Sequence, residues 1–79
     1  MKYIVIEIQT ADNGTVTPMV SVPYEDRLVA ESEYHRVLSY AAVSQLPMHA
    51  VVMLASNGRN IKFEVYEHGQ EIGPEPESE

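Results

Sequence analysis

The chain has 79 residues, of which 44% are hydrophobic, a formal net charge of −7 and no cysteine. This length predicts one domain with a small core, built from a single sheet and one helix. The lack of cysteine excludes disulfides, thiolate metal sites and a cysteine nucleophile, and it fits the reducing cytoplasm, where we expect the protein to be located.

The negative charge is concentrated toward the end of the sequence. Residues 69–79 contain no basic residue and four glutamates, Glu71, Glu75, Glu77 and Glu79. The five basic residues are scattered, whereas direct binding to a nucleic-acid backbone needs clustered Lys and Arg, so we expect no direct nucleic-acid binding. The apolar run in MKYIVIEIQT is too short for a signal peptide, and no segment approaches the length of a bilayer span. We therefore expect no membrane association.

Residues 2–9, KYIVIEIQ, are rich in β-branched side chains and predict a strand. ADNGT then predicts a hairpin turn into a second strand over 15–22. A two-residue loop would place Ile6 opposite a serine, whereas a three-residue loop over 12–14 places it opposite Val20. We favour the second register because apolar side chains then meet on one face. Pro18 indicates that the second strand lies at a sheet edge.

The next segment, PYEDRLVAESEYHRVLSYAAVSQLP, predicts a helix. Asp26 is the expected N-cap, and Pro47 marks the latest point by which the helix has ended. One apolar stripe has helical spacing and is expected to pack on the sheet, namely Ala30, Tyr34, Val37, Leu38 and Ala41.

Residues 49–55, HAVVMLA, are apolar on both faces, which predicts a central strand. SNG then turns the chain into a last strand over 60–68. A two-residue loop at Asn57 and Gly58 pairs Val52 with Phe63, and a three-residue loop would pair Val51 with Phe63. Both registers are chemically possible, and turn preference favours the first.

These elements predict an α+β fold of order ββαββ over residues 1–68, followed by a disordered acidic tail over 69–79. A helix crossing one face returns the chain so that the third strand pairs antiparallel with the first. The expected result is a four-stranded antiparallel sheet of order 2-1-3-4, with the helix packed on one face.

The face without the helix is expected to be more apolar than an ordinary solvent-exposed surface. We therefore expect it to bind a second copy of the chain or another partner. With the helix placed on the Ile4, Ile6 and Ile8 side, this partner face contains Tyr3, Val5, Glu7, Met19, Val51, Met53, Glu64 and Tyr66.

Two histidines and a tyrosine are expected near one end of the sheet. In the favoured register His49 lies opposite Tyr66, and His68 falls close by, so these three form a candidate ligand end. A metal site needs three convergent ligands, and only the two histidines are expected to be close together. We expect no metal and no cofactor.

No catalytic pattern stands out. The sequence lacks Gly-x-Ser-x-Gly, a phosphate-binding glycine loop and paired carboxylates on adjacent strands. Ser32 and Ser39 lie near His35 in sequence, but no third group is evident to orient that histidine. We expect the protein not to be an enzyme.

The segments YIVIEIQ, GTV, AESEYHRVLSYAAVS, HAVV and YEH together resemble small proteins of prophages in Gram-positive gut bacteria. The resemblance extends over about residues 3–68. This chain departs from the group at Phe63 and Val65, where the group has small or polar residues, and at Pro18. The resemblance implies a prophage origin and a location in the cytoplasm of the host cell, and it transfers no catalytic residue.

The leading hypothesis is a nonenzymatic prophage-type protein that binds a host protein, with an anti-defence inhibitor as its concrete form. Acidic residues near the helix start are candidates for entering the basic groove of a host nuclease, although they also stabilise the helix dipole: Glu25, Asp26, Glu31 and Glu33. Two alternatives remain open. One is a protein that sequesters a nucleotide signal at the ligand end, with Arg59 and Lys62 as further contacts. The other is a structural or assembly component of a phage particle.

Overall fold

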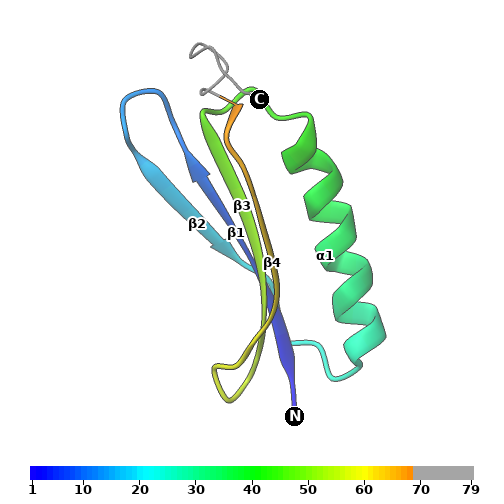
Figure 1. Ribbon diagram of the computed structural model, residues 1–79. Coiled ribbons are helices and arrows are strands. Elements are labelled where there is room, and N and C mark those ends of the chain that lie inside the picture. Colours follow the sequence, from blue (N-terminus) through cyan, green and yellow to red (C-terminus); the bar gives the residue numbers. More distant parts are fainter. Residues whose placement is uncertain (69–79) are drawn as a thin grey trace.

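A computed structural model describes residues 1–68 and has the predicted ββαββ order (Figure 1). Its elements are β1 (Tyr3–Thr10), β2 (Val16–Val20), α1 (Arg27–Ala42), β3 (Met48–Ala55) and β4 (Asn60–Tyr66). The four strands form one antiparallel sheet of order β2-β1-β3-β4, which confirms the predicted topology. The predicted acidic tail over 69–79 lies outside the described residues.

The first hairpin has the predicted three-residue loop. Ala11 N donates to Thr15 O at 2.9 Å, Gly14 has a φ of 88°, and Ile6 lies opposite Val20. The left-handed conformation at this position costs little free energy for glycine, because glycine has no Cβ to clash. The turn therefore sets the register that the apolar pairing favoured.

Strand β2 lies at the sheet edge, as Pro18 indicated. Backbone pairs that exchange hydrogen bonds alternate along an antiparallel ladder. Ala11 bonds to Thr15 and Ser21 N donates to Val5 O, so Pro18, opposite Ile8, occupies a position without such bonds. Its nitrogen consequently faces the free edge, where a missing N–H costs nothing within the sheet.

Helix α1 begins and packs as its sequence predicts. The Asp26 side chain caps it by accepting from Leu28 N at 2.9 Å. The stripe Ala30, Tyr34, Val37 and Ala41 is buried, and Leu38 packs against it half-buried. The helix ends at Ala42, before Pro47.

The second hairpin combines the two registers that the sequence left open. Its turn has three residues, because Ala55 N donates to Arg59 O at 2.9 Å and Gly58 is left-handed at φ 91°. A bulge then shifts the register, so that Leu54 lies opposite Asn60 but Val52 lies opposite Phe63. One extra residue in a strand produces such a shift. Beyond the bulge the favoured pairing is confirmed.

The helix covers the face opposite to the one predicted. Val5, Val51 and Met53 are only 3%, 0% and 0% exposed and form the core with α1. The assignment of these residues to an uncovered partner face was therefore wrong. Glu7, Glu64 and Tyr66 share their side of the sheet, since Glu7 pairs with Val51, Val51 with Glu64, and Tyr66 with the buried His49. Met19 pairs with Glu7 and also lies on this side.

The handedness of the chain explains which face the helix covers. Strands β2 and β3 run parallel with β1 between them, and connections between parallel strands of one sheet are right-handed in about 98% of cases. The backbone carbonyl of Val5 points toward β2, because it accepts from Ser21 N at 2.9 Å. For L-residues, this backbone orientation and a right-handed connection together direct the Val5 side chain toward the helix.

Candidate functional site

The face of the sheet away from α1 carries apolar side chains on all four strands. Figure 1 shows the helix on one side of the sheet and no described element over the other. We call this second side the open face, and strand pairing assigns to it Ile4, Ile6, Ile8, Thr10, Val16, Pro18, Val20, Met48, Ala50, Val52, Leu54, Asn60, Phe63 and Val65. Among these residues only Thr10 and Asn60 carry polar side chains.

Exposure on the open face is greatest on the two edge strands. Val20 and Phe63 are 63% and 62% exposed. On the central strands Ile6 and Val52 are half-buried, because neighbouring side chains on the same face cover their flanks. Hydrophobic surface that is continuous across four strands is typical of a contact site for another molecule.

A small polar cluster lies on the helix side of the sheet. His49 is 3% exposed, and its Nε2 lies 2.5 Å from a carboxylate oxygen of Glu7, which also accepts from Gln9 Nε2 at 3.0 Å. The Nδ1 atom of His49 is buried without a hydrogen-bond partner. A carboxylate and an imidazole form two parts of a nucleophilic triad. Within residues 1–68 no hydroxyl bonds to the second imidazole nitrogen, so the third member of a triad is missing. The contact between Glu7 and His49 instead links β1 to β3.

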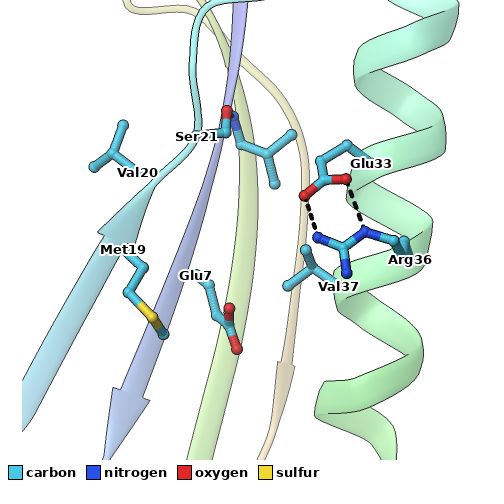
Figure 2. A pocket seen from close by; sticks show the side chains of 8 residues that line it. Glu7, Met19, Val20, Ser21, Glu33, Arg36 and Val37 are labelled. Carbon is cyan, nitrogen blue, oxygen red and sulfur yellow. Dashed lines mark hydrogen bonds and ion pairs between the residues drawn. The ribbon is translucent and has the colours of Figure 1, made fainter.

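A hollow of about 140 Å³ lies beside this cluster, between α1 and the first hairpin. Figure 2 shows Met19 and Ser21 on one side, Arg36 and Val37 on the other, and the Glu7 carboxylate pointing between them. The hollow is smaller than the roughly 300–1,000 Å³ of ordinary ligand sites. It exists because α1 packs on β1, β3 and β4 and not on β2.

The charges that face the hollow are already paired. Arg36 donates to both carboxylate oxygens of Glu33, at 2.8 and 2.5 Å (Figure 2). These hydrogen bonds hold the pKa of Glu33 below its ordinary value and raise the pKa of Arg36. A charged ligand entering the hollow therefore has to compete with an ion pair that is already formed.

The candidate ligand end is only partly assembled. His49 lies opposite Tyr66 as predicted, and the rings of Tyr66 and His68 stack with centroids 5.9 Å apart. However, the His49 imidazole bonds to Glu7, and His68 Nε2 donates to Ala41 O at 2.8 Å. That carbonyl is one of the last four of α1, which have no partner within the helix. His68 therefore stabilises the helix end, and the described residues contain no group of three or more metal-ligating side chains.

The residues of β4 that face the helix lie toward opposite ends of the strand. Glu64 and Tyr66 lie near the buried Tyr34, and burial first, then the Glu64 charge, raises the pKa of Tyr34. Lys62 lies nearer the turn and contacts Glu31 at 3.9 Å. Arg59 is in the turn itself, so the two basic residues do not join the ligand end.

The four acidic residues near the helix start each have a partner. Asp26 caps the helix. Glu25 pairs with Lys2 at 3.6 Å, and Glu31 pairs with Arg27 at 3.2 Å. Glu33 is held by Arg36, as described above. Because three of the four carboxylates are paired with basic side chains, this region is a weaker candidate than the open face for binding a basic groove.

Sequence reasoning missed the open face because it assigned these residues to the helix side. The signal was present in the hairpin register, since the three-residue turn determines which residues of β1 point their backbone groups toward β2. Combined with a right-handed connection, that register places Ile4, Ile6 and Ile8 away from the helix.

Comparisons with protein-family models, curated proteins and solved structures found no match to this chain. In the part of the chain that the structure describes, α1 is neither long nor apolar enough to cross a membrane. The fold and the surface define the class as a small α+β ββαββ protein with an open apolar sheet face.

Proposed function

We propose that this chain is a nonenzymatic prophage-type binding protein whose function depends on protein–protein contact through the open face. The observation that carries the proposal is the continuity of apolar side chains across all four strands, with Thr10 and Asn60 as the two polar members. Fully buried interface cores are depleted in charge and rich in apolar residues. The open face of the single chain is likewise free of charged residues and rich in apolar ones.

The size of the open face fits a contact surface. Strand spacing of about 4.8 Å and a rise of about 3.3 Å per residue give it a flat footprint of about 400 Å². The accessible area of side chains standing on that footprint is larger, and the smallest specific interfaces bury about 600 Å² per partner. The open face is therefore close to the size that a specific contact needs.

The resemblance to prophage proteins supports a bacterial host protein as the target. Inhibition of a host defence protein is the concrete form of this proposal. A binding inhibitor needs a surface that excludes water and no reactive group, because its effect comes from occupying a site on its target. The paired acids near the start of α1 offer less to such a target than the open face does.

Affinity capture from host lysate tests the proposal. Wild type and Leu28→Lys should retain the same host protein, and Phe63→Lys should lose it. Leu28 is a matched control because it is 72% exposed on α1, away from the open face, and the charge change is identical. Retention of the same host protein by Phe63→Lys would contradict the proposal.

A second candidate function is sequestration of a nucleotide signal. It is favoured by the buried, unpartnered Nδ1 of His49 and by the stacked rings of Tyr66 and His68. Isothermal titration with cyclic dinucleotides tests it, with His68→Ala as the variant that should lose binding. Absence of heat from wild type at two temperatures would exclude these ligands, because the enthalpy of binding changes with temperature.

A further inference from the structure

The largest apolar side chains of the sheet lie outside the core formed with α1. The helix-side core contains Ala30, Ala41 and Ala55 among its buried residues, and Val51 and Met53 are its largest fully buried side chains. The open face carries three isoleucines, a leucine and the only phenylalanine of the chain. Burial of apolar area is worth about 25 cal/mol per Å², so covering this layer would be strongly favourable.

We propose that the partner covering the open face is a second copy of this chain, packed face to face with the two α1 helices on the outside. This inference rests on the proposed function and names the first partner of the same surface. The host target would then replace the second copy on the open face.

The charge distribution favours a second copy. A two-fold interface brings the same patch of both copies together, so any charge near the axis meets a like charge. Among the strand residues, Glu7, Lys62 and Glu64 all lie on the helix side, as their pairing with Val51 and Met53 shows. Two open faces therefore meet without repulsion and without burying an unpaired charge, which is costly.

The need for cover from the moment of folding also favours a second copy. An interface that resembles half of a domain core is characteristic of obligate homodimers. Every cell that makes this chain contains further copies of it, whereas a host target is present at its own concentration. Self-association therefore covers the open face whenever the host target is not bound there.

Strand β2 disfavours edge-to-edge association at one of the two sheet edges, the other edge being β4. Pro18 faces the β2 edge with its nitrogen, where an incoming strand would require an N–H donor. Proline on an edge strand is a recognised barrier to strand addition. Contact through the face remains open, and the sheet centre lies between β1 and β3, at the paired Ile6 and Val52.

Sedimentation velocity on the purified full chain provides the first test. Wild type and Leu28→Lys should sediment at twice the chain mass of 8.9 kDa. Phe63→Lys should sediment as a folded monomer, with a dimer dissociation constant raised at least about 100-fold, as for an interface hot spot. Phe63 is suitable because it is 62% exposed in the single chain, so the substitution leaves the core with α1 intact. Circular dichroism checks that the variant is folded.

Cysteine cross-linking provides a second test that does not depend on a destabilising variant. The chain has no cysteine, so a single introduced thiol reports one position. Facing sheets pack about 10 Å apart with their side chains meeting between them, so Val52→Cys should give a disulfide-linked dimer under mild oxidation. Ser32→Cys, exposed on α1, should give none, because the helices lie on opposite outer surfaces.

The outcomes separate this inference from the proposed function. A monomeric wild type, a dimer that survives Phe63→Lys, or cross-linking through Ser32→Cys but not Val52→Cys would each overturn the face-to-face dimer. If wild type is monomeric and Phe63→Lys still loses the host protein, the proposed function stands without the dimer. If wild type is monomeric and Phe63→Lys retains the host protein, both the face-to-face dimer and the proposed function are wrong.

Discussion

The two faces of the sheet differ in what covers them. On the helix side, Val5, Val51 and Met53 are buried by α1, and the polar residues Glu7 and His49 are paired with each other. On the open face, larger apolar side chains such as Phe63 remain exposed, and no polar network accompanies them. The comparison shows that in a small domain the face richest in apolar side chains need not be the one that its own helix covers. The apolar side chains that the helix leaves exposed are then available to bind a partner.

The largest effect should come from the helix side. Met53→Ala should lower the free energy of unfolding by about 2–5 kcal/mol, because it removes a fully buried side chain. The loss should be the same at every protein concentration, since the core belongs to one chain. Urea denaturation at low and high concentration measures it.

Phe63→Ala is the matched change on the open face. At concentrations where wild type is monomeric its effect should be within about 0.5 kcal/mol, as for other surface positions. At concentrations where wild type is dimeric, the variant should be clearly less stable, because oligomerisation stabilises the folded state by mass action. A cost independent of concentration would mean that Phe63 packs within its own chain and would break the contrast between the faces.

An intermediate effect is expected from the polar cluster. His49→Leu should cost about 1–3 kcal/mol, because Glu7 loses a hydrogen-bond partner in a partly buried position. Glu7→Gln is the control, since it keeps a polar group next to His49 and removes the charge. Equal stability of His49→Leu and wild type in urea denaturation would show that Glu7 is adequately hydrated without His49.

The smallest effect should come from the exposed ion pair beside the hollow. Arg36 holds the pKa of Glu33 below its ordinary value of 4.5, so the pair stabilises the fold above that pH. The contribution is lost as the pH falls through the lowered pKa of the folded state. Arg36→Gln should therefore lose less stability than wild type between pH 5 and pH 2, as followed by thermal denaturation across that range. A steeper acid loss in the variant would contradict the role of this pair.

Much of the local structure could be predicted from particular residues. Asp26 marked the start of α1, the left-handed Gly14 set the first hairpin, and Pro18 identified the edge strand. Each of these residues has a conformational restriction or freedom that acts within a few positions of the chain. The second hairpin was predicted less completely, because a bulge near its turn joins a three-residue turn to the pairing of Val52 with Phe63.

The sequence by itself determined the elements, their order in the sheet and the alternation of side chains along each strand. It also determined that one sheet face would be left apolar and uncovered. Only the tertiary structure decided which face that was. Alternation separates two sets of residues without saying which set meets the helix, and β3 is apolar in both. The choice depends on the hand of the connection through α1, a property of L-residues in a twisted sheet that no single strand contains.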